Sequence, residues 1–123
     1  MKPRILIADD EPDSAEMMAL ILGYTGYDVT RAYDGAQALE LARSERPDVL
    51  LLDVRMPKLY GSDVVRRIKA DPELADKITI LFSSADEDEV HWREAGADAF
   101  LQKPIDIRML PEFVGGLLAA RRH

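Results

Sequence analysis

The sequence of 123 residues contains no cysteine, which excludes both a disulfide framework and thiolate ligands for a metal ion. It also lacks a long apolar run, since no stretch approaches the roughly 18 apolar residues that a membrane-spanning helix needs. The apolar stretch near the amino terminus is only a few residues long, too short for the core of a signal peptide. We therefore expect a cytoplasmic protein with no membrane partner.

An excess of basic residues is also missing. Lys and Arg total 16 against 23 Asp and Glu, which gives a formal net charge of −7 at pH 7. Because non-specific nucleic-acid binding needs a basic surface, this balance argues against a nucleic-acid partner. Hydrophobic residues make up 47% of the chain and charged residues 32%, as is typical of a globular protein. The length fits one domain, and we expect residues 1–123 to form it without a second domain.

Short apolar segments alternate with segments of helical pattern five times along the chain. The expected strands cover residues 4–8, 27–32, 49–52, 78–82 and 99–101, and the expected helices cover residues 12–23, 36–44, 62–71, 87–95 and 106–121. Alternation at this spacing predicts an α/β fold of three layers. A doubly wound parallel sheet of five strands, joined by right-handed crossovers, would carry helices on both faces.

The third expected strand is the most informative segment. Four apolar residues, Val49 to Leu52, run without interruption to a carboxylate at Asp53, and Pro57 then prevents a simple continuation of the strand. An unbroken apolar run of this length is typical of a central parallel strand buried on both faces. Because open α/β sheets bind ligands at the carboxyl ends of their strands, we expect Asp53 to lie at a binding site.

Polar side chains also follow the other strands that end at this edge of the sheet. They are Asp9 and Asp10 after the first strand, Ser83 or Ser84 after the fourth, and Lys103 after the fifth. Two carboxylates about 4 Å apart repel each other by roughly 4 kcal/mol at an effective dielectric constant of 20, so three carboxylates need cations nearby. A divalent metal ion and the Lys103 ammonium would supply that positive charge.

Magnesium is the metal ion that these ligands predict. It prefers oxygen ligands and usually takes one or two carboxylates, and no histidine or thiolate lies nearby in the sequence to favour zinc or copper. A carboxylate beside such an ion can act as a nucleophile toward phosphorus and form an acyl phosphate. The metal ion and Lys103 would neutralise the charge on the phosphoryl group, and a hydroxyl of Ser83 or Ser84 would donate a hydrogen bond to it.

Together these motifs resemble the receiver domains of two-component response regulators, which have the CheY-like fold. The resemblance covers essentially the whole chain, with the motifs in order on the expected strands. It rests on Ile5-Leu6-Ile7-Ala8-Asp9-Asp10-Glu11, on Asp53-Val54-Arg55-Met56-Pro57 with Gly61 eight residues after Asp53, on Ala95-Gly96-Ala97-Asp98, and on Lys103-Pro104. It implies a flavodoxin-like strand order, 2-1-3-4-5, and a single-domain receiver without an output domain.

The resemblance implies that Asp53 accepts a phosphoryl group from a histidine kinase or a histidine phosphotransfer protein. Together with Asp53, Asp10 would bind Mg2+ directly, Asp9 through water and Arg55 through its backbone carbonyl, while Lys103 would pair with the phosphoryl group. Such a protein is not an enzyme acting on other substrates, because it catalyses only its own phosphorylation and dephosphorylation. It would signal by contacts with a downstream protein, as a monomer or as a homodimer formed on phosphorylation.

Two further residues have implied roles in switching. Ser84 is followed by alanine and so matches the family's pair of a hydroxyl residue and alanine, which favours Ser84 over Ser83. Phe100 occupies the aromatic switch position, three residues before Lys103. The resemblance also implies a cis peptide bond before Pro104.

Two features depart from the family pattern. From Ser84 to Lys103 the chain is shorter than usual by about one helical turn of 3.6 residues, so the fourth helix or the loop before it must be trimmed. Phe100 lacks the hydroxyl of the usual tyrosine and its hydrogen bonds. Arg55 and Asp86 flank the site at positions that tune the lifetime of the phosphate in the family, and they could pair across it.

Two other functions are compatible with these residues. A receiver-like scaffold that is never phosphorylated would be a binding module with constitutive contacts, and it would show no saturable magnesium binding. A metal-dependent phosphatase with an aspartyl nucleophile often carries a second acid two residues after the nucleophile, where this sequence has Arg55. A flavin-binding protein is disfavoured, because the first strand-to-helix turn is acidic where an anionic phosphate would lie.

Overall fold

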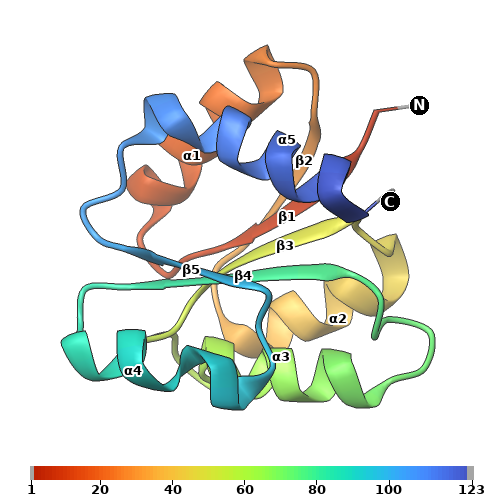
Figure 1. Cartoon of the computed structure of the whole chain (residues 1–123), viewed down its shortest axis with the longest axis vertical. Helices are drawn as coiled ribbons and strands as arrows, with labels where there is room; N and C mark the ends of the chain where they lie inside the picture. Colours follow the sequence, from red (N-terminus) through yellow and green to blue (C-terminus); the bar gives the residue numbers. More distant parts are fainter. Residues whose placement is uncertain (1, 122–123) are drawn as a thin grey trace.

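The computed structural model describes residues 2–121, which form a five-stranded parallel sheet covered by helices on both faces (Figure 1). The strands lie in the order β2-β1-β3-β4-β5, so the doubly wound topology expected from the sequence is confirmed. Their bounds are β1 (Arg4–Ala8), β2 (Asp28–Ala32), β3 (Val49–Asp53), β4 (Ile78–Ser83) and β5 (Ala99–Gln102).

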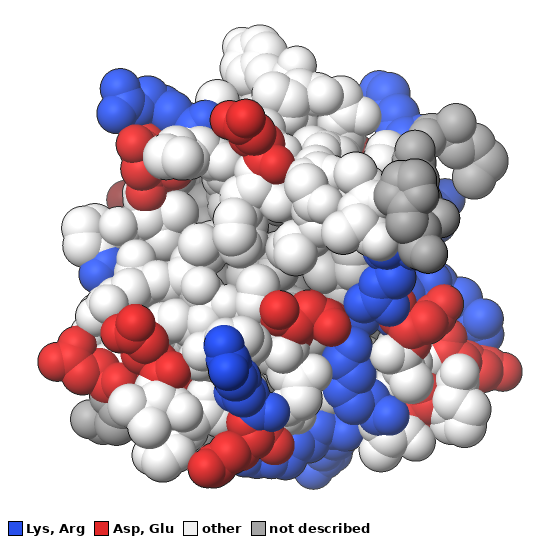
Figure 2. Space-filling view, in the orientation of Figure 1, with Lys and Arg blue, Asp and Glu red and all other residues white. Residues whose placement is uncertain are grey.

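The five α-helices divide between the two faces of the sheet. In Figure 1, α1 (Pro12–Tyr24) and α5 (Leu110–Arg121) lie above the sheet, and α2 (Gly35–Glu45), α3 (Gly61–Ala70) and α4 (Asp86–Ala95) lie below it. Figure 2 shows that charged side chains gather around the lower half of the same view, where α3 and α4 lie, whereas its centre is largely uncharged. Within residues 2–121, no helix combines the length and the apolar character needed to cross a membrane.

The central strand β3 separates two apolar clusters. All five of its residues are buried, as the unbroken apolar run predicts. Leu50 and Leu52 pack toward α2, α3 and α4, while Val49 and Leu51 pack toward α1 and α5. Because side chains of a strand alternate between its faces, each pair anchors one helical layer. Burial of each such side chain stabilises the fold by about 1.5–3 kcal/mol.

The third helix begins earlier than the sequence pattern suggests. Ser62, where the expected helix starts, carries a side chain typical of an N-cap but lies inside the first turn. The N-cap is Tyr60, whose side chain makes no capping hydrogen bond within the described residues. Gly61 is the first helical residue, and its backbone packs directly against that of Asp53. The helix start is therefore set by close packing against the end of β3, which sequence signals for capping do not report.

The last helix also differs from its expected bounds. Residues Ile107–Met109 form a 3-10 turn, which Asp106 caps by accepting a hydrogen bond from the Arg108 backbone N–H at 3.1 Å. The α-helix itself begins at Leu110, with Pro111 in its first turn. Proline is accepted there because the first turn of a helix leaves its N–H groups without intrahelical partners.

Candidate functional site

Three carboxylates meet at the carboxyl end of the sheet. Ala8 of β1 pairs with Leu52 of β3, so the next residues along these strands, Asp9 and Asp53, lie side by side. One carboxylate oxygen from each of Asp9, Asp10 and Asp53 falls within 4.8 Å of the others. The clustering expected from the order of the strands is therefore present in the structure.

Asp9 carries a buried oxygen that has no partner. The residue is fully buried, and its Oδ1 accepts a hydrogen bond from the Glu11 backbone N–H at 3.0 Å. Its Oδ2 is buried and has no hydrogen-bond partner among the residues that the structure describes. An unsatisfied carboxylate oxygen away from water is costly, and a cation removes that cost. The three acids offer only oxygen donors, and Asp10 is exposed, so the residues fit a hard divalent cation such as Mg2+ that enters from solvent.

Both oxygens of Asp53 are held in place by hydrogen bonds. Lys103 Nζ donates to Asp53 Oδ2 at 3.0 Å, and the Arg55 backbone N–H donates to Oδ1 at 3.2 Å. The Asp53 side chain is 5% exposed and that of Lys103 is 24% exposed. The peptide bond between Lys103 and Pro104 is cis, as the family resemblance implies. Lys103, expected to bring positive charge to the acidic cluster, therefore forms an ion pair with Asp53 that is largely shielded from solvent.

The surroundings of the pair raise the pKa of Asp53 well above its ordinary value of 3.8. Burial raises the pKa of Asp53 to about 6; the hydrogen bond and charge of Lys103 and the hydrogen bond from Arg55 oppose this rise, and the charge of Asp9 adds to it. Burial of the ammonium lowers the pKa of Lys103. The hydrogen bond and charge of Asp53, together with the charges of Asp9 and Glu11, outweigh this effect, so the pKa is raised overall. At neutral pH, therefore, Lys103 is a cation and Asp53 is mostly ionised.

The two serines at the end of β4 have different surroundings. Ser83 is buried, and its hydroxyl donates to Asp88 Oδ2 at 2.6 Å and accepts from the Ala85 backbone N–H at 3.1 Å. Asp53 is in register with Phe82, so the Asp53 side chain lies on the side of the sheet opposite to that of Ser83. Ser84 is exposed, and with the Ser83 hydroxyl already engaged toward α4 it is the better candidate for a phosphoryl ligand.

Asp88 of α4 lies beside the site, and the sequence did not predict its role. Arg55 binds it through two hydrogen bonds, from Nε to Oδ2 at 3.0 Å and from Nη2 to Oδ1 at 3.2 Å. The sequence suggested Asp86 as the partner of Arg55, but Asp86 Oδ1 accepts a hydrogen bond from Gln102 Nε2 at 3.0 Å. Asp88 thus links α4 both to the loop after β3, through Arg55, and to the end of β4, through Ser83.

Phe100 of β5 lies beside α4. It is half-buried and stacks on Trp92 of α4, with ring centroids 6.5 Å apart and an angle of 18° between the ring planes. Both rings pack against the apolar cluster beneath the sheet. A movement of the Phe100 ring would therefore displace Trp92 of α4. The switching role of Phe100 stays a prediction.

Comparison with known proteins identifies the fold and the family. The family model for the response regulator receiver domain matches residues 5–114. The chain is similar to two solved structures: a CheY-like receiver domain protein from Methanospirillum hungatei (26% identity, TM-score 0.91, 99% of this chain and 98% of that one) and the chemotaxis response regulator CheY4 of Vibrio cholerae (25% identity, TM-score 0.88, 95% and 99%). The CheY-like fold is therefore confirmed.

Curated relatives include longer proteins. The DNA-binding response regulator MtrA of Mycolicibacterium smegmatis is 41% identical over 105 residues, which cover 85% of this chain and 45% of that protein. The DNA-binding dual master transcriptional regulator RpaA of Synechocystis is 35% identical over 118 residues, which cover 94% of this chain and 49% of that protein. The chain thus spans about half the length of these relatives. Since the family model covers most of its length, the chain belongs to the response regulator receiver domain family.

Proposed function

We propose that Asp53 accepts a phosphoryl group from the phosphohistidine of a histidine kinase or of a histidine phosphotransfer protein. The observation that carries the proposal is the environment of Asp53: a buried carboxylate with Lys103 at 3.0 Å and the partnerless Oδ2 of Asp9 in the same acidic cluster. A structural lysine–aspartate pair would not need two further acids beside it. A phosphoryl-transfer site needs them to hold a cation.

The transfer converts a nitrogen–phosphorus bond into an oxygen–phosphorus bond. An oxygen of ionised Asp53 attacks phosphorus, the bond to the imidazole nitrogen breaks, and its electron pair returns to that nitrogen. Lys103, kept protonated beside Asp53, pairs with the phosphoryl oxygens as the acyl phosphate forms. Mg2+ held by Asp9, Asp10, Asp53 and the Arg55 carbonyl would neutralise part of the charge on the phosphoryl group.

The phosphorylated chain would change its affinity for a downstream protein. In this proposal Ser84 donates its hydroxyl hydrogen to a phosphoryl oxygen, and the contact between Phe100 and Trp92 carries the change to α4. The protein signals in the cytoplasm through protein–protein contacts, as a monomer or as a homodimer formed on phosphorylation. It does not turn over other substrates, and Arg55 stands where an aspartyl phosphatase often has its second acid.

Incubation with acetyl phosphate and Mg2+ tests the proposal. Intact-mass measurement should show one added phosphoryl group that is stable in acid and labile in base. Asp53→Asn should abolish the addition, while Asp63→Asn, which removes a partly exposed carboxylate that pairs with Arg66 on α3, should leave it unchanged. Full phosphorylation of the Asp53→Asn variant would contradict the assignment.

A scaffold that is never phosphorylated predicts a different result. Such a protein would gain no phosphoryl group from acetyl phosphate and would show no saturable Mg2+ binding in calorimetry. The partnerless oxygen of Asp9 argues against this alternative. In a scaffold that binds no metal ion, this buried oxygen would reduce stability without any compensating interaction.

A further inference from the structure

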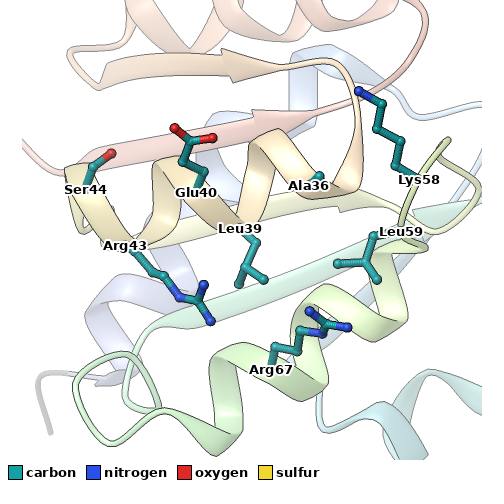
Figure 3. Close-up of a pocket in the computed structure, with 8 residues that line it drawn as sticks. All are labelled: Ala36, Leu39, Glu40, Arg43, Ser44, Lys58, Leu59 and Arg67. Atoms are coloured by element: carbon teal, nitrogen blue, oxygen red, sulfur yellow. The ribbon is translucent and has the colours of Figure 1, made fainter.

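A groove of about 650 Å³ lies between α2 and α3, on the helical layer below the sheet (Figure 3). It is lined by residues of both helices and by Lys58 and Leu59 from the loop that follows β3. None of Asp9, Asp10, Asp53 or Lys103 lines it. The groove is therefore separate from the acidic site, although the same loop borders both.

Two guanidinium groups point into this groove from opposite sides. Figure 3 shows Arg43 reaching down from α2 and Arg67 reaching up from α3. Both side chains are exposed, and neither has an ion pair or hydrogen bond to another residue in the part of the chain that the structure describes. Two unpaired cations facing one groove are unexpected in a protein of net charge −7, where acids are available to pair with them.

The other charged residues at the groove do not neutralise these cations. Glu40 extends away from the groove in Figure 3. Lys58 also points away and lies 3.6 Å from Asp34. Arg43 and Arg67 are thus the charged side chains that point into the groove, and their positive charges favour an anion there.

The groove also has an apolar floor. Leu39 is 6% exposed and belongs to the core cluster below the sheet, and the half-buried Leu59 packs against the same cluster. In Figure 3 the Leu39 side chain lies between the two arginines, and Leu59 lies on the other side of the Arg67 guanidinium, below Lys58. A ligand here would therefore meet an apolar surface flanked by two positive charges.

We propose that this groove binds an acidic peptide segment of a partner protein, with an apolar side chain on Leu39 and Leu59 and carboxylates on Arg43 and Arg67. A small inorganic anion would leave the apolar floor unused. A nucleic-acid backbone needs a longer basic track than two free arginines. A segment with one apolar residue between acidic residues matches both features of the groove.

A defined peptide tests the proposal. The probe is a fluorescein-labelled Gly-Glu-Glu-Leu-Glu-Glu-Gly, and two control peptides carry glutamine in place of glutamate or serine in place of leucine. Binding is followed by fluorescence anisotropy at low salt, and the amide shifts of the 15N-labelled protein locate the contact. We expect shifts centred on residues 39–43 and 59–67, and weaker binding of both control peptides.

Variants separate the groove from general surface charge. Arg43→Gln and Arg67→Gln should each weaken binding by about fivefold, the effect of an exposed ion pair at the upper end of its usual range. Arg66→Gln is the matched control, because Arg66 lies next to Arg67 on α3 but already pairs with Asp63 at 3.1 Å. It should bind the peptide as tightly as the unmodified chain.

Several outcomes would overturn the proposal. They are a dissociation constant weaker than about 1 mM for the acidic peptide, equal losses for Arg66→Gln and Arg67→Gln, and tighter binding of a single-stranded oligonucleotide at the same arginines. Self-association that Arg43→Gln abolishes would assign the groove to a second copy of the chain instead. The proposal does not rest on phosphorylation, so the Asp53→Asn variant should bind the peptide unchanged even if Asp53 proves not to accept phosphate.

Discussion

Gly61 lies so close to Asp53 that a Cβ atom on Gly61 would be 2.3 Å from the Asp53 carbonyl oxygen and 2.9 Å from its carbonyl carbon. The Gly61 N–H also donates to the Val54 carbonyl at 2.9 Å. The start of α3 and the end of β3 are therefore packed backbone to backbone, at the residue proposed to accept phosphate. A side chain at position 61 can be accommodated only by moving one of them.

Gly61→Ala should therefore be destabilising and should also impair the site. We expect a loss of about 1–3 kcal/mol in the free energy of unfolding, the usual cost of overpacking a close contact, measured by urea denaturation. Phosphorylation of Asp53 by acetyl phosphate should slow, because the carboxylate moves with its backbone. Gly116→Ala is the control, because a Cβ atom added there would meet no described atom within 4 Å beyond its own stretch of helix. Alanine in this helix should stabilise by up to about 1 kcal/mol. Equal stability of the two variants would disprove the packing argument.

The raised pKa of Asp53 predicts how stability depends on pH in the absence of metal ions. With a pKa of about 6 in the folded state and 3.8 as its ordinary value, the folded protein binds more protons than the unfolded chain between these values. The ionisation of Asp53 therefore lowers stability as pH rises from about 4 to 6, and the full loss is present above pH 6. Asp53→Asn removes this loss and should stabilise the protein by about 1–3 kcal/mol at pH 7.5, but by much less at pH 4.5.

Urea denaturation of both proteins in EDTA measures this difference. The comparison at two pH values cancels changes that other titrating groups cause in both proteins alike. A stability gain from Asp53→Asn that is the same at pH 4.5 and 7.5 would show that packing, and not charge, distinguishes the two side chains.

Magnesium binding should depend on the buried carboxylate of Asp9. Asp9→Asn removes negative charge from the cluster and places an amide where an oxygen now lacks a partner, so we expect at least tenfold weaker binding in calorimetry. Affinity for the unmodified chain should fall below about pH 6, because protons compete with the metal ion for Asp53. Asp13→Asn changes an exposed acid in the first turn of α1 and is the charge-matched control. Identical affinities of the Asp9 and Asp13 variants would place the metal site elsewhere.

The sequence predicted the fold and the central residues of the site because both follow from strand order. Asp53 ends β3, and Asp9 and Lys103 come directly after β1 and β5, so all three lie at the carboxyl edge of one parallel sheet. The role of Asp88 could not be predicted in this way. Its contact with Arg55 depends on how α4 turns after a connection of two residues, and a sequence does not give the rotation of a short helix.

The start of α3 and the groove between α2 and α3 could not be predicted from the sequence either. Ser62 carries a capping side chain, yet the helix begins at Gly61 because only glycine fits against Asp53. Arg43 and Arg67 lie on separate helices, and in the sequence each is an ordinary exposed arginine. Their convergence on one groove becomes visible only when α2 and α3 are packed together.

The two serines at the end of β4 should respond to substitution in opposite ways. Ser83→Ala removes the hydroxyl that donates to Asp88 and accepts from the Ala85 N–H, so it should cost about 1–3 kcal/mol of stability in urea denaturation. Ser84 is exposed, so Ser84→Ala should change stability by less than about 0.5 kcal/mol. If Ser84 donates to the phosphoryl group, this second variant should instead phosphorylate about tenfold more slowly, the effect of losing one hydrogen bond to a charged group. Slow phosphorylation of Ser83→Ala, with Ser84→Ala unaffected, would assign the phosphoryl contact to Ser83 and require β4 to turn its end toward Asp53.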